Sequence, residues 1–224
     1  SVSAFAGNPY FIDLDILFEK GLLTRDELES QKQWTPYVCD FAALYKRYSL
    51  FGKIAQRVSY RSDVERFISE NPQLGDFCRF MALKAANGQK AWWEWTEHSA
   101  CDENILFMHK FLQYEFFTQW EAVRKYANSR GIKIIGDMPI YVDTDSSDVY
   151  FDRDNFLLGK ENKPCLVAGV PPDYFAPEGQ LWGNPIYNWD RMKEDGYSWW
   201  IRRMKHTMRL YDAVRIDHFR AFSS

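Results

Sequence analysis

Two short strand-like segments separated by a helical pattern constrain the fold of this chain more than any other feature. Residues 132–142 form a run rich in β-branched side chains, and residues 213–217 form a second short apolar run. A loop-rich stretch and then a helical pattern at about 197–211 lie between them. A strand, a crossover helix and another strand make up a βαβ unit, which implies a parallel sheet. The sequence therefore predicts an α/β fold.

Each strand-like segment carries an acid near its C-terminal end, Asp137 in the first and Asp217 in the second. Alternation along a strand places Arg215 on the same face as Asp217. The apolar residues of 213–216 suggest a buried strand, where a lone charge costs several kcal/mol. The pair is therefore either a structural ion pair or part of a functional site. Acids at the carboxyl ends of parallel strands are typical of the active sites of (β/α)8 barrels.

Composition and charge argue against several classes of protein. The formal net charge of −3 and the lack of a basic run disfavour a nucleic-acid partner. No apolar stretch has the length of a transmembrane helix, which disfavours a membrane partner. The four cysteines are scattered, form no CxxC pair, and favour reduced thiols in the cytoplasm over disulfides or a zinc site. They are Cys39, Cys78, Cys101 and Cys165.

Motifs for metals, nucleotides and nucleophilic serines give no support to those chemistries. Asp143, Asp145 and Asp148 are spaced like part of a calcium loop. That loop requires a glycine at the position of Asp148, so a polar turn with helix-capping acids is the preferred interpretation. The sequence has no HExxH, P-loop, GxGxxG or GxSxG motif. We therefore expect neither a metal nor a cofactor.

Residues from about 24 to 130 show mostly helical patterns. Thr24 and Ser62 each precede a glutamate by three residues, a capping box that marks a helix start. The longest helical pattern runs from about 102 to 126, and Gly131 stands where a helix stop is expected. Residues 143–187 are loop-rich, with many prolines and glycines, and a loop region of this length is usually functional or disordered. Its aromatic residues argue against disorder.

Five motifs occur in order along the chain and together resemble those of one family. They are GDMPIYV at 136–142, DS at 145–146, GVPPDYF at 169–175, GQLWGNP at 179–185 and VRIDHFR at 214–220. They closely resemble the motifs of glycoside hydrolase family 77, the 4-α-glucanotransferases, also called amylomaltases or disproportionating enzymes. The segment SAFAGNP at 3–9 also resembles the N-terminal region of that family. The resemblance thus spans essentially the whole chain.

The resemblance implies a (β/α)8 (TIM) barrel related to the α-amylase clan. Residues 1–224 would form an incomplete catalytic barrel, about its first half, with a largely helical insertion at roughly 24–100. An aromatic active-site loop is expected at roughly 165–187. The family's general acid/base glutamate belongs to a barrel strand that would follow Ser224, so the chain is expected to be inactive alone. The start without methionine also suggests that an N-terminal piece is missing.

The resemblance also implies roles for eight residues. Asp217 matches the family's nucleophile, Arg215 matches the arginine beside it, and Asp137 matches an acid that supports the sugar subsite. His218 follows the nucleophile and is assigned to active-site support. Four residues match a mobile loop that covers the bound glucan: Tyr174, Phe175, Gln180 and Trp182.

The function implied by the resemblance is transfer of α-1,4-glucan segments between maltooligosaccharides, in starch and glycogen metabolism. A retaining double displacement uses two carboxyl groups and needs neither a metal nor a cofactor. Maltooligosaccharides and α-glucans are the expected partners, and the sequence contains no indication of an oligomeric state. The aromatic share of 17% suits stacking on sugar rings, although a bulky core explains most of it.

Two other interpretations stay open. A retaining α-glucan hydrolase of the α-amylase clan would share the nucleophile strand but pass its product to water. A non-catalytic glucan-binding fragment would use the aromatic loop without any chemistry. The loop also has a purely structural interpretation, as a rigid surface loop held by buried aromatic anchors.

Overall fold

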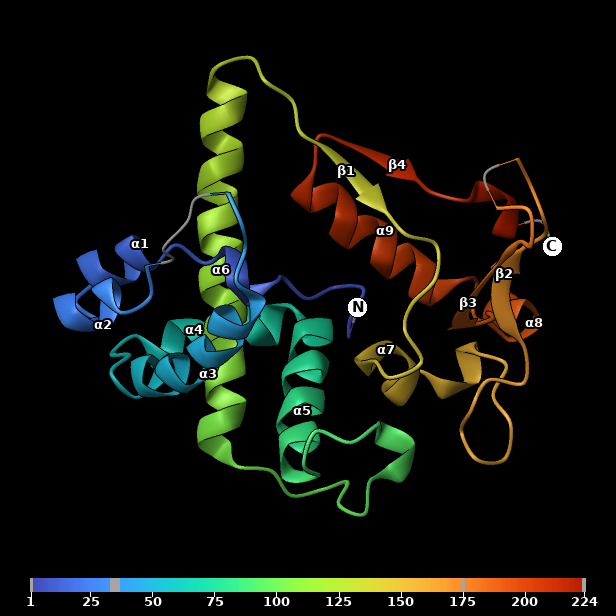
Figure 1. The fold of residues 1–224 in the computed structure, drawn as a ribbon, viewed down its shortest axis with the longest axis horizontal. Coiled ribbons are helices and arrows are strands. Elements are labelled where there is room, and N and C mark those ends of the chain that lie inside the picture. Colours follow the sequence, from blue (N-terminus) through green and yellow to red (C-terminus); the bar gives the residue numbers. More distant parts are fainter. Residues whose placement is uncertain (1, 33–36, 175, 223–224) are drawn as a thin grey trace. The chain divides into compact units, whose positions relative to one another are not determined.

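The computed structural model describes residues 2–32, 37–174 and 176–222, and the chain divides into two compact units (Figure 1). Unit 1 consists of Ser1–Phe5, Asn87–His98 and Val123–Ser224. Unit 2 consists of Ala6–Ala86 and Ser99–Ala122. The strands of the described residues all belong to unit 1, whereas unit 2 is helical where it is described. Among the described helices, none combines the length and apolar character that a membrane span requires.

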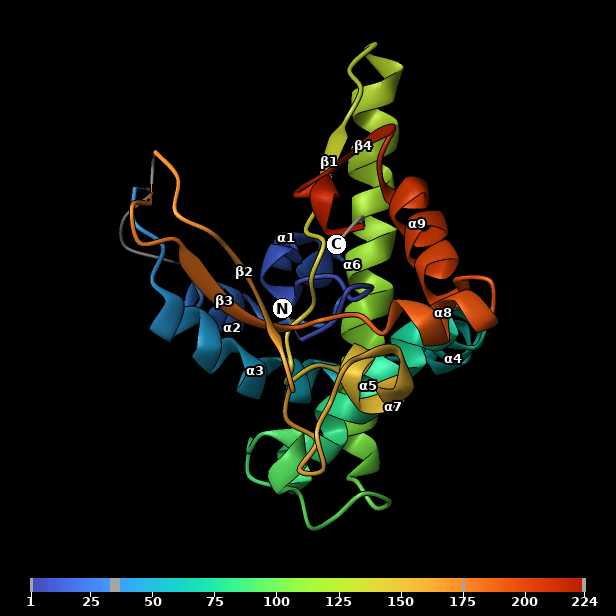
Figure 2. The same ribbon diagram turned by 90° about the vertical axis from the view of Figure 1, so that its right-hand side faces the viewer.

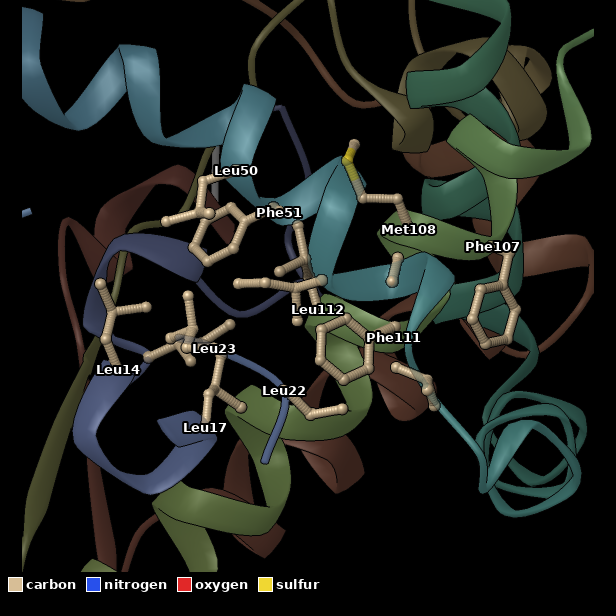
Figure 3. Packing of buried hydrophobic residues seen from close by; sticks show 14 of the residues in the cluster. Leu14, Leu17, Leu22, Leu23, Leu50, Phe51, Phe107, Met108, Phe111 and Leu112 are labelled. Carbon is tan, nitrogen blue, oxygen red and sulfur yellow. The ribbon is translucent and has the colours of Figure 1, made fainter. Parts of the chain in front are cut away.

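Unit 2 is built from helices whose apolar residues recur at helical spacing. Its helices are α1 (Leu14–Glu19), α2 (Arg25–Glu29), α3 (Phe41–Gln56), α4 (Arg61–Glu70), α5 (Pro72–Ala86) and most of α6 (Glu103–Ser129), with the 3-10 helix η1 at Pro9–Phe11. In α6, Phe107 and Phe111 lie one turn apart and form one apolar stripe with Leu112. This stripe belongs to the same buried cluster as Phe51 of α3 and Leu17 of α1 (Figure 3). The helices of unit 2 therefore enclose an apolar core.

The two predicted capping boxes have different outcomes. At α2 the prediction is confirmed: the Thr24 hydroxyl accepts from the Glu27 amide at 3.2 Å, and the Glu27 carboxylate accepts from the Thr24 amide at 2.9 Å. At α4 it is wrong, because the helix begins at Arg61 and Ser62 lies inside its first turn. Glu65 does not reach back to cap the helix, since its carboxylate pairs with Lys110 at 2.8 Å.

The long helix and its stop signal are confirmed. The helix α6 spans Glu103–Ser129, and Gly131 follows it with a φ of +74°. The amide of Ile132 donates to the Ala127 carbonyl at 3.1 Å, and the amide of Gly131 donates to the Asn128 carbonyl at 2.9 Å. This is a Schellman motif, in which the left-handed position favours glycine. The chain thereby turns out of the helix toward the first strand.

Unit 1 contains the strands and three further helices. They are β1 (Ile135–Met138), α7 (Ser147–Phe151), β2 (Val167–Val170), β3 (Gln180–Pro185), α8 (Trp189–Glu194), α9 (Ser198–Leu210) and β4 (Ala213–Ile216). Short 3-10 helices lie at Trp92–Glu94 (η2), Arg153–Asn155 (η3) and Phe219–Phe222 (η4). The strand β1 is shorter than the predicted segment 132–142. It ends before Pro139, which has no amide hydrogen to continue a ladder.

The predicted βαβ unit is confirmed by the pairing of β1 with β4. The two strands are parallel, with Ile135 opposite Ala213 and Asp137 opposite Arg215 (Figures 1 and 2). The helix α9 precedes β4 and contacts the buried face of β1, where the Thr207 hydroxyl lies 3.7 Å from the sulfur of Met138. This crossover fixes which residues of the two strands face each other.

The prediction that 143–187 is loop-rich is only partly correct. The segment also contains the helix α7 and an antiparallel pair, β2 with β3 (Figure 2). Glycine permits this pairing rather than preventing it: a Cβ on Gly169 would lie 2.5 Å from the carbonyl oxygen of Gln180. Gly179, at the start of the returning strand, has a φ of +72°. Glycines here allow a close backbone approach that other residues would block.

The prediction of a buried second strand is wrong. In β4, Ala213 and Arg215 are exposed, while Val214 and Ile216 are half-buried. In β1, Ile135 is 71% exposed. Within the described residues these strands pair only with each other, and α9 packs on one face of them. The charges at the strand ends therefore lie in a largely solvated setting.

Candidate active site

Asp137 and Arg215 face each other across the β1–β4 ladder. Their Cα atoms are register partners. The guanidinium of Arg215 donates twice to the Asp137 carboxylate, from Nε to Oδ1 at 2.9 Å and from Nη2 to Oδ2 at 2.6 Å. Such a two-pronged contact fixes the orientation of both planar groups. It explains why an acid and an arginine occupy opposing positions near the carboxyl ends of two parallel strands.

Asp217 comes directly after β4 and extends the ladder. Its amide donates to the Met138 carbonyl at 3.2 Å. Its Oδ1 lies 3.6 Å from Nη2 of Arg215, so the arginine contacts both carboxylates. The predicted Arg215–Asp217 pair is present, but Asp137 is the closer partner of the arginine. All three side chains are about half exposed or more, which differs from the predicted partly buried pair.

Asp137 is ionised at neutral pH at its ordinary pKa, and the contact with Arg215 favours that charged state further. Hydrogen bonding to the guanidinium lowers the pKa of the Asp137 carboxyl below its ordinary value, and the same contact raises the pKa of Arg215. In its charged state Asp137 can only accept hydrogen bonds. A group held in this state cannot act as a general acid.

His218 and Trp182 form an aromatic contact beside Asp217. The centroids of their rings are 4.6 Å apart, and Nε2 of His218 lies 3.8 Å from Oδ2 of Asp217. His218 has a φ of +50°, a conformation that residues other than glycine rarely adopt and that often marks functional positions. Trp182 belongs to β3 and donates from Nε1 to the Gln180 side chain at 2.9 Å. The β2–β3 hairpin thus brings two of the predicted loop residues toward the end of β4.

Of the two remaining loop residues, the structure describes only Tyr174. Tyr174 lies between β2 and β3 and is 93% exposed. Phe175 lies outside the described residues. Next to Tyr174, the carboxylate of Asp173 accepts from the Ala176 amide at 2.7 Å. The structure therefore unites Asp137, Arg215, Asp217, His218 and Trp182, with Gln180 held against the indole.

A buried arginine supports β1 from behind, and the sequence analysis did not identify it. Arg203 of α9 is 2% exposed. Its guanidinium donates to the carbonyls of Pro139 and Ile140, the latter at 3.0 Å. The hydroxyl of Tyr187 donates to the Ile140 carbonyl as well, at 2.7 Å. The signal was present in the sequence, because Arg203 lies one turn from Trp199 on the apolar face of a helix.

A second support lies at the other end of the strands. The carboxylate of Asp212, just before β4, accepts from Arg124 at 2.8 Å, from Asn128 at 2.8 Å and from the Ile134 amide at 2.8 Å. These hydrogen bonds lower the pKa of Asp212 to about 2. They join the end of α6 to the starts of β1 and β4. Spacing alone could not reveal a contact between residues 78 or more positions apart.

The acidic turn at 143–148 is a structural feature. Asp143 accepts from the Asp145 amide at 3.1 Å, and Ser146, rather than an acid, caps α7 by accepting from the Val149 amide at 3.3 Å. Asp148 is buried and accepts from the Ala4 amide at 2.8 Å. Burial raises its pKa to about 6. Among the described residues no group of three or more histidine, cysteine or acidic side chains is placed to hold a metal ion.

Comparison with known proteins gives consistent matches over the whole chain. A family model described as 4-alpha-glucanotransferase matches residues 1–224. The 4-alpha-glucanotransferase of Clostridium butyricum is 43% identical over 246 aligned residues, which cover 100% of this chain and 50% of that protein. The 4-alpha-glucanotransferase of Thermus thermophilus is 41% identical and covers 100% of this chain and 48% of its own. The chain thus spans about half the length of the curated relatives it matches.

A solved structure agrees with these sequence matches. The structure described as amylomaltase from Streptococcus agalactiae in complex with acarbose aligns with a TM-score of 0.90 and 38% sequence identity. The alignment covers 99% of this chain and 49% of that chain. This chain therefore shares the mixed helical and strand fold of the corresponding part of that amylomaltase.

Proposed function

We propose that this protein transfers α-1,4-glucan segments between maltooligosaccharides. The chain belongs to the glycoside hydrolase 77 family, described as 4-alpha-glucanotransferase. The observation that carries the proposal is the contact of Arg215 with both Asp137 and Asp217 at the carboxyl ends of neighbouring parallel strands. Carboxylates at this position are where parallel α/β barrels carry out their chemistry.

In this proposal Asp217 is the nucleophile of a retaining mechanism. Its carboxylate oxygen attacks the anomeric carbon of the donor glucan, and the bond to the leaving 4-oxygen breaks as that oxygen takes a proton from a second carboxyl group. A covalent glucosyl–enzyme ester results. The 4-hydroxyl of an acceptor glucan then attacks the same carbon, gives its proton to the second carboxylate and releases Asp217.

Arg215 and Asp137 have positioning roles in this scheme. The two-pronged contact with Asp137 fixes the guanidinium, which then holds the carboxylate of Asp217 from one side. Asp137 does not supply the acid, because it is ionised at neutral pH and the contact with Arg215 lowers its pKa further. Retaining enzymes place their two carboxyl groups about 5–5.5 Å apart. We assign the acid/base to a residue outside these 224, which leaves the chain without turnover when it is alone.

The hairpin residues and His218 are assigned to the sugar-binding side of the site. Trp182 offers an aromatic face next to His218, and Gln180 offers an amide that recognises hydroxyls. Tyr174 and Phe175 are assigned to the same loop, roughly 165–187, as a cover over the acceptor. A cover that holds an acceptor sugar and excludes water favours transfer over hydrolysis.

The proposal extends to the architecture and the setting of the protein. Residues 1–224 would be part of a (β/α)8 barrel, with a helical insertion at roughly 24–100. The parallel β1–β4 pair with its crossover helix supports this assignment. The scattered cysteines and the glucan substrate support a cytoplasmic role in starch and glycogen metabolism.

Incubation of the full-length protein with maltotriose tests the proposed function. Transfer yields glucose and a ladder of longer maltodextrins, because each cleaved segment passes to another sugar. A retaining hydrolase yields only short sugars, with one new reducing end for each bond cleaved. Binding without any product would favour the non-catalytic alternative. Either of the last two results contradicts the proposal.

A further inference from the structure

Unit 1 contains a polar groove that the proposed reaction does not use. It consists of two adjoining hollows of about 490 and 460 Å³, within the range of ligand sites. Residues 150–155 form one side, and Arg191 of α8, Asp195 directly after α8, and the first part of α9 form the other. The two hollows share Arg153, Asp154 and Arg191, so they form one continuous depression. We refer to it as the α7–α9 groove.

A buried amide lies in the wall of this groove. Asn155 lines the larger hollow and is only 7% exposed. Its backbone is satisfied, since its amide donates to the Asp152 carbonyl at 2.9 Å and its carbonyl accepts from Asn188 at 2.9 Å. Its side-chain carboxamide makes no hydrogen bond to any residue in the described part of the chain. Among the described residues, the fully buried side-chain atoms without a partner belong to Arg47, Trp199, Trp200 and Arg203, and Asn155 is not one of them. The Asn155 amide therefore reaches the solvent of the groove and is available to a ligand.

The charges around the amide are balanced. Three arginines and three aspartates line the larger hollow: Arg153, Arg191, Arg202, Asp152, Asp154 and Asp195. Equal numbers of each sign disfavour a strongly anionic ligand, which would require an excess of arginine or lysine. Aspartate accepts hydrogen bonds, arginine donates them, and an amide does both. A neutral ligand with many hydroxyl groups matches this lining.

Several of these groups have capacity to bind a ligand. Asp154 is exposed and has neither a hydrogen bond nor an ion pair within the described residues. The guanidinium of Arg191 lies 3.8 Å from the Glu194 carboxylate, which is a loose contact. Arg153 lies against the rings of Trp92 and Tyr150, which holds its guanidinium in place. Phe151, 37% exposed, adds an aromatic edge on which a sugar ring could lie.

We propose that the α7–α9 groove binds glucose units of an α-1,4-glucan chain. This inference rests on the proposed function, because it takes the protein's substrate to be a glucan. None of the groove residues is among Asp137, Arg215 and Asp217, so a sugar held here does not react. Its effect is to retain a long glucan at the protein, which raises affinity for polymers more than for short sugars.

The test compares two groove variants with a matched control in the full-length protein. Asp154→Ala removes the exposed acceptor, and Asn155→Leu replaces the buried amide by an apolar side chain of similar size. Asp190→Ala is the control, because Asp190 is an exposed aspartate at the start of α8 outside the groove lining. Transfer kinetics are measured with amylose and with maltotriose, and glycogen retention is measured by affinity electrophoresis.

Loss of one or two hydrogen bonds is expected to raise the KM for amylose roughly fivefold to tenfold in each groove variant. The increase for amylose should exceed that for maltotriose by at least threefold, and mobility in glycogen gels should rise. The control should match the unmodified protein. If the Asn155→Leu variant fails to fold, the result for Asp154→Ala alone tests the proposal. Groove variants with unmodified amylose KM and glycogen retention would overturn the proposal.

The glycogen measurement separates this inference from the proposed function. If the unmodified protein transfers no glucan, but the groove variants lose glycogen retention, the binding site is supported and the proposed reaction is disproved. If the unmodified protein transfers glucan from maltotriose, but the groove variants keep full glycogen retention, the proposed reaction is supported and glucan binding in the groove is disproved.

Discussion

The two faces of the β1–β4 pair are held in different ways. On the face toward α9, Met138 and Ile140 are each 3% exposed, and buried Arg203 bonds to the backbone that follows β1. On the other face, the side chains of Asp137 and Arg215 are 57% and 64% exposed and hold each other by a two-pronged ion pair. One face is fixed by packing and buried hydrogen bonds, and the other by charges in contact with solvent.

The two faces of the β1–β4 pair are therefore expected to have different roles, one in stability and the other in catalysis. Groups that must meet a substrate need solvent access, and exposed ion pairs contribute little to stability. Buried polar groups are costly to disturb, because any partner left unsatisfied loses its hydrogen bonds. We therefore expect substitutions on the exposed face to change activity and those on the buried face to change stability.

The largest effect is expected for Asp217→Asn in the full-length protein. Loss of the nucleophile should lower kcat by at least about 1000-fold, or ~4 kcal/mol in the barrier. Because asparagine has nearly the same size and shape as aspartate, the thermal unfolding midpoint should stay close to that of the unmodified protein. Initial transfer rates on maltotriose and calorimetry measure the two quantities. Residual activity within tenfold of the unmodified protein would show that Asp217 is not the nucleophile.

Arg203→Met should be the most destabilising of these changes. The substitution leaves the Pro139 carbonyl without the guanidinium donor. It also removes one of the two donors to the Ile140 carbonyl, which still accepts from the Tyr187 hydroxyl. The expected cost is about 2–4 kcal/mol in the free energy of unfolding, measured by urea denaturation. Lys205→Met is the control, because Lys205 is an exposed cation on the same helix. Equal stability of the two variants would contradict the buried support.

Asp148→Asn should make stability less dependent on pH. The folded carboxyl has a pKa of about 6, above its ordinary 3.8, because burial disfavours the charged form. A raised carboxyl pKa means that this group lowers stability as pH rises from about 4 to about 6, after which its effect is constant. Asparagine can still accept from Ala4 but carries no charge. The variant should therefore be more stable at pH 7.5, by roughly 3 kcal/mol at most.

The measurement is the difference in unfolding free energy between this variant and the unmodified protein, from pH 4 to pH 7.5. The difference should grow with pH and level off above about 6. A constant difference across that range would mean that Asp148 does not titrate in this window.

The smallest change in stability is expected for Asp137→Asn. Its pKa is lowered by Arg215, so any stabilising contribution is present above the ordinary pKa of 3.8 and fades as pH falls below it. Because the pair is exposed, the unfolding midpoint at pH 7 should scarcely move, while transfer activity should fall as Arg215 loses its anchor. An unfolding midpoint lowered as far as that of Arg203→Met would break the comparison between the two faces.

Local signals in the sequence predicted the elements that depend on neighbouring residues. Thr24 and Glu27 form the predicted capping box, and Gly131 ends α6 with a positive φ. Both features involve residues within one helical turn, so spacing is sufficient to identify them. Ser62 had the same spacing and failed, because Glu65 found a better partner in Lys110, 45 positions away.

In the candidate site, too, spacing predicted the contact between near neighbours but not the contact between distant residues. Alternation placed Arg215 and Asp217 on one face of β4, and they are in contact. The closer partner of Arg215 is Asp137, which depends on the register of two strands 78 positions apart in the chain. The exposure of the strands was also missed, since an apolar run has the same pattern whether a further layer covers it or not.

The amino-acid sequence was sufficient to identify the family, the parallel βαβ unit, and the residues to which the chemistry is assigned. Motif order and short-range spacing are written directly in the chain, and they need no knowledge of distant contacts. Three features required the three-dimensional structure: Arg215 contacts two carboxylates, Arg203 supports β1 from its buried face, and Asn155 lines a polar groove. These features arise from residues brought together across long stretches of chain, where burial and strand register set which partners a side chain can reach.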